Sequence, residues 1–216
     1  MLLVDHQIEK FCSEEHYPRT WVTPMLPDSP SQECEIINAG PLITPFETCH
    51  LGPAAYDICI GIAFASPVAI EAYVVRAIGN SFERIRAINK DIEIDGSKHI
   101  RAIGEIIEVI LEPNQVVLCH SMEYVRIPPN MRGSVSMRSS FARDWLDHSA
   151  ADNIWPGFQG QITFELRNNG PHQYTLRSNM RPLQLSFDHL PVAPRNPYSG
   201  LYQNQRAQLH SRMVRE

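Results

Sequence analysis

The sequence has few cysteines, and their arrangement excludes several kinds of site. Its 216 residues include five cysteines, an odd number, and no two of them form a C-x-x-C pair. A disulfide framework or a cysteine-rich zinc site is therefore not expected, and we interpret the cysteines as buried or free thiols in a reducing cytoplasm. The nine histidines show no metal-ligand spacing, so we expect no bound transition metal and no zinc.

Long apolar runs and basic segments are also missing. No apolar run approaches the roughly 20 residues that a membrane helix requires. The N-terminal segment MLLVDHQIEK contains Asp5 and no basic stretch, so it is not predicted to be a signal peptide. The net charge of −5 disfavours binding to nucleic-acid phosphates. We therefore expect a cytoplasmic globular protein that binds neither nucleic acid nor membrane.

Two signatures of nucleotide enzymes are absent. Neither GxxxxGK[ST] nor GxGxxG occurs, so no standard phosphate loop is expected. The zinc deaminase signature, H-x-E with P-C-x-x-C, is missing as well, and His120 and Glu123 have the spacing H-x-x-E, which does not fit it. Zinc-dependent base deamination is therefore excluded.

Glycine is scarce relative to proline. The sequence has 17 prolines and 11 glycines, and the prolines interrupt short apolar runs, which disfavours long helices. One short helix is predicted near the N-terminus, where Asp5 can cap it and where Ile8, Phe11 and Cys12 share one face. Most of the remaining chain is predicted to be extended.

Several segments predict individual strands. Residues 55–66 are typical of one buried strand. Residues 71–105 alternate isoleucine with charge and predict a hairpin that turns near Asp95-Gly96. Three further extended runs occupy residues 105–140.

The clearest strand pattern is QITFELRNN, residues 161–169. Apolar and polar residues alternate along it, so one set of side chains is predicted to face the core and the other set, with Glu165, the opposite side. Residues 174–190 predict two more strands around a turn at Ser178-Asn179. So many short strands are typical of a β-sandwich or barrel.

Three features have a chemical interpretation and a purely structural one. Residues 138–143, RSSFAR, place two cations around two hydroxyls, which suits a phosphate or a nucleobase carbonyl; the alternative is a helix start with Ser139 or Ser140 as N-cap. Glu165 could have a raised pKa and act as general base or acid, or it could be an exposed strand residue. Residues 154–160, IWPGFQG, predict a tight turn before the Glu165 strand.

In chain order, four segments resemble the dCTP deaminase branch of the dUTPase superfamily: RSSFAR, HSAADNIWPGFQGQITFEL, RSNMRPLQLSF and the tail's YQNQ with SR. The similarity is dense from about Ile107 to Phe187, and LGPAAYDICIG resembles the family's early strand. The resemblance implies a mainly β protomer, a distorted β-barrel or jelly-roll with short helices, in residues 1–190. Residues 71–105 would be an insertion. Residues 191–216 would form an arm that closes over the nucleotide.

The resemblance also implies a homotrimer with sites between subunits. The same assembly is favoured by the polar arm, for which we expect no partner within one subunit. The implied reaction is zinc-independent deamination of dCTP, or of a modified relative, to dUTP and ammonia, with Mg²⁺ bound through the triphosphate and not by protein side chains. Glu165 would activate the water that attacks C4, Ser139 and Arg143 would orient water and polarise the pyrimidine, and the main chain of Ala151 would select the base. The implied nucleotide-binding residues are Arg138, Ser140, Asp152, Trp155, Tyr198 and Gln205.

The sequence departs from the family pattern in the turn before the Glu165 strand. The family usually has Ile-Asp-Pro-Gly there, and this chain has Trp155 in place of the aspartate. An indole cannot deprotonate water, which puts triphosphate hydrolysis in doubt. Asp152 could replace the missing carboxylate at the sugar, or Trp155 could simply pack at a subunit contact. Two alternatives to the deaminase stay open, a nucleotide-binding regulator and a dUTP diphosphatase.

Overall fold

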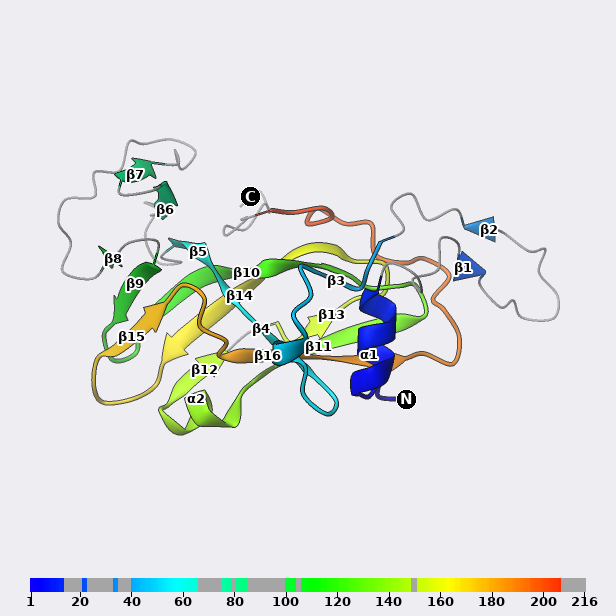
Figure 1. Ribbon diagram of the computed structural model, residues 1–216, viewed down its shortest axis with the longest axis horizontal. Coiled ribbons are helices and arrows are strands. Elements are labelled where there is room, and N and C mark those ends of the chain that lie inside the picture. Colours follow the sequence, from blue (N-terminus) through cyan, green and yellow to red (C-terminus); the bar gives the residue numbers. More distant parts are fainter. Residues whose placement is uncertain are drawn as a thin grey trace, which may run out of the picture.

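The computed structural model describes residues 1–13, 21–22, 33–34, 40–65, 75–78, 81–84, 100–103, 106–148 and 151–206. These residues form mainly β-strands, with a few short helices (Figure 1). The helices are α1 (Asp5–Cys12), the 3-10 helix η1 (Thr48–His50) and α2 (Ser139–Arg143). No helix in this part of the chain has the length and apolar character needed to span a membrane.

Antiparallel pairing organises the described strands into two larger and three smaller sheets. The first large sheet has the order β12-β14-β10-β3, and β5 also pairs with β10; its strands are β3 (Ile43–Thr44), β5 (Ile60–Ala65), β10 (Val116–Arg126), β12 (Leu146–His148) and β14 (Gln159–Asn168). The second has the order β13-β11-β16-β4 and consists of β4 (Tyr56–Ile58), β11 (Met131–Met137), β13 (Asn153–Ile154) and β16 (Leu183–His189).

The smaller sheets lie at the periphery (Figure 1). They are β15-β9-β8, β6-β7 and β1-β2, with the strands β1 (Trp21–Val22), β2 (Glu33–Cys34), β6 (Val75–Ile78), β7 (Ser81–Arg84), β8 (Ile100–Ile103), β9 (Ile106–Leu111) and β15 (Tyr174–Arg177). The prediction of a mainly β fold is confirmed. In the described residues the strands form separate antiparallel sheets, and no closed barrel is present.

The core is built from the alternating strands that the sequence predicts. Every second residue of β14 is buried, and Phe164 and Leu166 have no exposed surface. They belong to the same apolar cluster as Leu185 and Phe187 of β16 in the second sheet. Because each such side chain contributes about 1.5–3 kcal/mol on burial, this alternation fixes the face on which the intervening polar residues lie.

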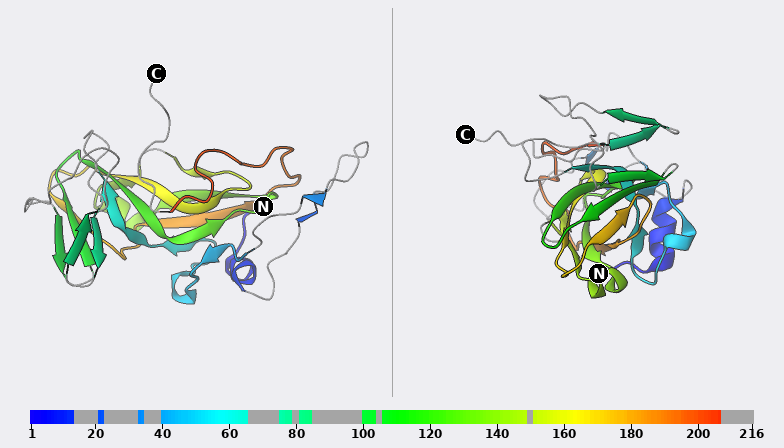
Figure 2. Two further views of the ribbon diagram at one scale, coloured as in Figure 1. Left: turned by 90° about the horizontal axis from the view of Figure 1, so that it is seen from above. Right: turned by 90° about the vertical axis from the view of Figure 1, so that its left-hand side faces the viewer.

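Helix α1 covers the outside of the sheets (Figure 2, right). It buries Ile8 and Cys12, as predicted. Its N-cap is Val4 and not Asp5, since the backbone at Val4 is still extended. The Val4 N–H donates to the side chain of Gln7 at 3.1 Å. Asp5 instead occupies the first turn, where its negative charge is favourable.

The segment 55–66 contains two strands, and the prediction of one continuous strand is wrong. Strand β4 pairs with β16 of the second sheet, whereas β5 pairs with β10 of the first. The chain changes sheets at Cys59, whose main-chain N–H donates to the carboxylate of Glu123 at 3.0 and 3.1 Å instead of to a neighbouring strand. A side-chain acceptor here ends one ladder and allows the next to begin.

Within residues 71–105 the structure describes the strands β6, β7 and β8. Strands β6 and β7 pair so that Ile78 lies opposite Ser81, and β8 pairs with β9. The predicted turn at Asp95-Gly96 lies outside the described residues. By contrast, the turn at Ser178-Asn179 is confirmed, with Asn179 at a φ of 68°, which asparagine tolerates.

Candidate functional site

Glu165 lies in the middle of β14, on the face opposite to Phe164 and Leu166. It is paired in register with Leu118 of β10 and is partly buried. Its Oε2 atom is buried and has no hydrogen-bond partner among the residues that the structure describes. Burial raises the pKa of this carboxyl, and the charge of His148 offsets part of that rise. A carboxyl with a raised pKa and an unpaired oxygen is suited to exchanging a proton.

His148 is a neighbour of Glu165 that the sequence analysis did not single out. It ends β12, whose pairing with β14 sets His148 opposite Leu166. Its Nε2 atom lies 3.3 Å from the carbonyl oxygen of Ala151, and its Nδ1 atom is buried without a partner in the described chain. Strand pairing, and not sequence spacing, brings His148 to Glu165, so no local signal could have found it.

A cavity of about 480 Å³ opens over the polar face of β14. Five of the predicted site residues line it: Ala151, Trp155, Glu165, Tyr198 and Gln205. The other lining residues are Leu118, Asn153, Ile154, Phe158, Ile162, Thr163 and Tyr202. A largely apolar cavity with a few polar groups is typical of a small-molecule site. Among these lining residues Glu165 is the one carboxylate, and there is no lysine or arginine.

Tyr198, Tyr202 and Gln205 of the C-terminal arm, residues 191–206, line one side of this cavity. The arm runs along its own chain (Figure 2, left). The Gln161 N–H donates to the carbonyl of Gln205 at 3.0 Å, and the Gln205 side chain donates back to the carbonyl of Gln161 at 2.6 Å. Gly160, with a φ of 151°, permits this approach, since a Cβ there would lie 3.1 Å from the Gln205 side chain. The expectation that the arm has no partner within one subunit is therefore wrong.

The RSSFAR segment lies elsewhere on the chain. Ser139, Ser140 and Arg143 belong to α2 and are exposed, and none of them lines the cavity. Neither serine caps the helix, because Arg138 is the N-cap residue and its side chain makes no cap hydrogen bond. The Arg138 guanidinium instead pairs with Asp57 at 3.2 Å. Within a single chain, therefore, Ser139, Ser140 and Arg143 do not line the cavity that contains Glu165.

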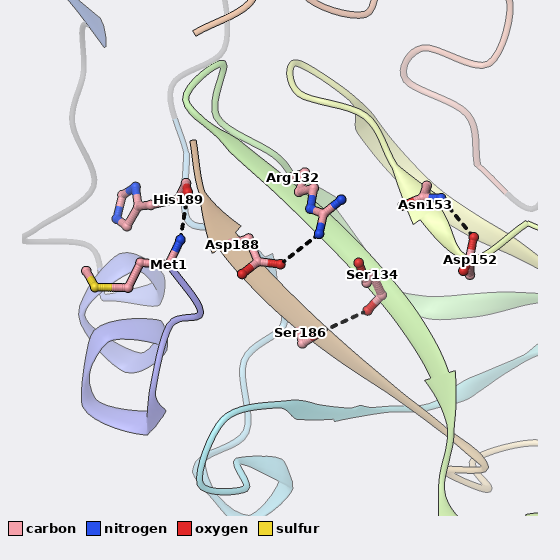
Figure 3. A network of polar contacts seen from close by, with 8 residues as sticks. All are labelled: Met1, Arg132, Ser134, Asp152, Asn153, Ser186, Asp188 and His189. Atoms are coloured by element: carbon pink, nitrogen blue, oxygen red, sulfur yellow. Dashed lines mark hydrogen bonds and ion pairs between the residues drawn. The ribbon is translucent and has the colours of Figure 1, made fainter. Parts of the chain in front are cut away.

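Trp155 stands at the rim of the cavity, with 64% of its surface exposed. It also lines a second cavity of about 660 Å³, together with Arg132 and Asn153. Asp152 lines neither cavity and accepts a hydrogen bond from Asn153 at 2.9 Å, near the ion pair of Arg132 with Asp188 at 3.4 Å (Figure 3). The carboxylate closest to Trp155 in the sequence thus faces its neighbour and not the cavity of Glu165.

Comparison with known families gives a match over most of the chain. The sequence model of the dCTP deaminase-like family matches residues 35–190. The chain belongs to this family. The match includes α2, β14 and Glu165, and it ends before the arm. The resemblance inferred from the four sequence segments is thereby confirmed.

Two relatives are similar over most of their length. The dCTP deaminase of Pyrococcus horikoshii is 32% identical over 165 residues, which are 75% of this chain and 84% of the relative. A protein of Persephonella marina, named dCTP deaminase, dUMP-forming, is 30% identical over 173 residues, 80% of this chain and 88% of the relative.

A solved structure shares the fold. The crystal structure of 2′-deoxycytidine 5′-triphosphate deaminase from Agrobacterium tumefaciens superposes with a TM-score of 0.51 at 18% identity. The superposition covers 86% of this chain and 47% of that chain.

Proposed function

We propose that this chain removes the 4-amino group of dCTP by hydrolysis and releases dUTP and ammonia. Family membership supports this, as do the names of relatives at about 30% identity. The observation that carries the proposal is the buried, unpaired Oε2 atom of Glu165 in the cavity over β14. The direct test is chromatographic analysis of products from a panel of deoxynucleoside triphosphates, including 5-substituted cytosines.

The proposed chemistry needs one group that both takes and gives a proton. A bond forms between the water oxygen and C4, and the bond between C4 and the amino nitrogen breaks. Ionised Glu165 takes one proton from water, and protonated Glu165 then supplies it to the departing ammonia; the second water proton, left on the oxygen at C4, passes to N3 of the uracil ring. A pKa raised by burial favours this exchange. In this mechanism, water activation at C4 rests on hydrogen-bond donors and Glu165 and involves no zinc.

A triphosphate needs cations that the described lining of the cavity does not provide. Arg143 is exposed on α2, with Ser139 and Ser140 beside it. We infer that a neighbouring copy in a homotrimer supplies them, with Ser139 and Arg143 at the pyrimidine and Ser140 and Arg138 at the phosphates. Mg²⁺ would arrive with the phosphates, because it binds oxygen ligands and this lining has one carboxylate, which the reaction uses.

Exposed apolar side chains are consistent with such an assembly. Trp145 and Leu201 expose 64% and 62% of their surface. Large exposed apolar side chains favour contact with another subunit.

Within each subunit we assign the main chain of Ala151 to base selection and Tyr198 and Gln205 to closure over the phosphates, since all three line the cavity. A cytoplasmic location stays a prediction.

We further propose that the product is dUTP and not dUMP. Formation of dUMP requires a base that activates water for attack on the triphosphate. Trp155 cannot accept a proton, and Asp152 does not line the cavity. The name of the Persephonella marina relative, dUMP-forming, describes the alternative outcome.

Trp155→Asp is expected to keep deamination within roughly tenfold of the wild-type rate, because the indole is not a proton carrier in this mechanism. Wild-type protein is expected to release no pyrophosphate from any deoxynucleoside triphosphate. Trp155→Phe is the matched control, since it keeps an aromatic ring at the same exposed position and adds no carboxylate. Pyrophosphate released from dUTP by the wild type would contradict the assignment. A change of oligomeric state in Trp155→Asp alone would instead assign Trp155 to subunit packing.

His148→Asn is expected to move the acidic limb of the pH profile. Activity requires ionised Glu165, so kcat/KM is present above its pKa and is lost as the pH falls through it. The positive charge of His148 lowers that pKa, and removing it raises the pKa. The limb should therefore shift to higher pH, while exposed His172→Asn leaves it in place. A limb that stays or moves to lower pH in His148→Asn would contradict the coupling.

A further inference from the structure

A second group of ionisable side chains lies outside the cavity of Glu165. His50 ends η1, Cys59 joins β4 to β5, and Glu123 belongs to β10. One ligand atom from each lies within 4.8 Å of the other two. None of the three lines the cavity over β14. The group combines His50 and Cys59, nine residues apart, with Glu123, 64 residues beyond Cys59, and the proposed deamination does not use it.

Two of these residues are almost completely buried, Cys59 with 7% and Glu123 with 2% of its surface exposed. Both carboxylate oxygens of Glu123 accept the Cys59 main-chain N–H, so the carboxylate is held beside the thiol. Burial raises the pKa of the Cys59 thiol to about 12, which disfavours a role as a free reactive thiolate. A metal ion can still displace that proton, because thiolate is the binding form.

The donor atoms are one sulfur, one nitrogen and one carboxylate oxygen. Zinc and similar borderline metals bind all three types, whereas Mg²⁺ and Ca²⁺ prefer oxygen. Zinc bond lengths of about 2.3 Å to sulfur and 2.0–2.1 Å to nitrogen place two tetrahedral ligands roughly 3.6 Å apart. The Cys59 Sγ and His50 Nδ1 atoms are 4.0 Å apart. All three donor atoms lie within 4.8 Å of one another, so no pair needs to close by more than about 1.2 Å, which side-chain rotation can supply.

The contact that competes for His50 is weak. The Tyr56 hydroxyl approaches His50 Nδ1 at 3.3 Å, which is long for an O–H donor. That hydroxyl also accepts the Glu47 N–H at 3.0 Å, and this bond would persist if a metal took the imidazole lone pair. Little is therefore lost when Nδ1 turns to a metal.

We propose that His50, Cys59 and Glu123 form a binding site for zinc or a similar divalent metal, separate from the deamination site. Binding replaces the Cys59 thiol proton, which is released to solvent, by a sulfur–metal bond. A divalent ion, a thiolate, a carboxylate and a neutral imidazole sum to zero charge, which suits a buried site. Three protein ligands leave a fourth position for water. The bound metal would join η1, the β4–β5 junction and β10.

The test is cobalt titration of the full chain after chelation and under a non-coordinating reductant. We expect one Co²⁺ per chain, with visible bands of tetrahedral cobalt and a thiolate-to-cobalt charge-transfer band. Cys59→Ser should lose the charge-transfer band, whereas the control Cys49→Ser, a neighbouring exposed thiol, should keep it. Glu123→Gln and His50→Gln should weaken binding by at least about tenfold. Zn²⁺ should displace cobalt and raise the melting temperature of the wild type and of Cys49→Ser but not that of Cys59→Ser, and Mg²⁺ should do neither.

Absence of the charge-transfer band in the wild type, or its loss in Cys49→Ser with retention in Cys59→Ser, would overturn the proposal. If Cys59→Ser does not fold, His50→Gln decides, because His50 is partly exposed and easily replaced. Wild-type cobalt affinity in folded His50→Gln would also overturn it. The deamination rate of metal-free protein should not change in His50→Gln, so the outcome here is independent of the proposed enzymatic activity.

Discussion

Replacing Glu165 with glutamine is expected to lower kcat for dCTP deamination by about 10²–10⁴-fold, the contribution of a positioned general base. The amide keeps the shape of the side chain and cannot take the proton of the attacking water. Nucleotide affinity should change little, because Glu165 acts on water and the leaving group. The measurement is ammonia release under saturating dCTP, together with calorimetric titration of dCTP into the variant.

Glu9→Gln provides the matched control for this variant. Glu9 is an exposed residue of α1 and lies outside the cavity, so the same chemical change there should leave the rate unaltered. A Glu165→Gln protein that keeps more than roughly a tenth of the wild-type rate would show that another group is the base. A variant that loses dCTP binding as well would assign Glu165 to substrate recognition.

Two inactive variants are expected to restore each other's activity when they assemble together. Arg143→Ala should lower the rate by about 10²–10³-fold, because it removes a charged donor from the transition state. In a homotrimer with sites between subunits, one subunit supplies Glu165 and its neighbour supplies Arg143. Co-expressed Arg143→Ala and Glu165→Gln chains should then recover about a quarter of the sites. A complete site needs an Arg143→Ala chain on the Glu165 side and a Glu165→Gln chain on the Arg143 side, and each occurs half of the time in an equal mixture.

The control for this experiment is the same pair of variants, purified separately and mixed without unfolding, which should stay inactive while the oligomers do not exchange. Co-assembled chains with no recovery would place Arg143 and Glu165 in the same subunit. Light scattering that finds a fully active monomer would reject the shared site altogether.

The position of Glu165 could be predicted because a strand has a period of two. The alternation in residues 161–169 is enough to set its face, and the structure confirms the buried positions of β14. The turn at 154–160 and the arm also bring Trp155, Tyr198 and Gln205 to the cavity, and their role in binding nucleotide stays a prediction. These features depend on local pattern or on the order of segments.

Other features depend on contacts between distant strands and left no sequence pattern. His148 reaches Glu165 only through the pairing of β12 with β14. Cys59 and Glu123 meet because the chain changes sheets between β4 and β5, which a continuous apolar segment does not reveal. Spacing along the chain alone therefore predicts no metal-ligand set among the histidines and cysteines.

A single product measurement distinguishes deamination alone from deamination with triphosphate hydrolysis. The full-length chain is incubated with Mg²⁺ and each deoxynucleoside triphosphate in turn, and nucleotides, ammonia and pyrophosphate are quantified together. We predict one ammonia for each dUTP formed from dCTP, or from a 5-substituted relative, and no pyrophosphate. Pyrophosphate release from dUTP, or tight binding of dCTP without any turnover, would contradict the account.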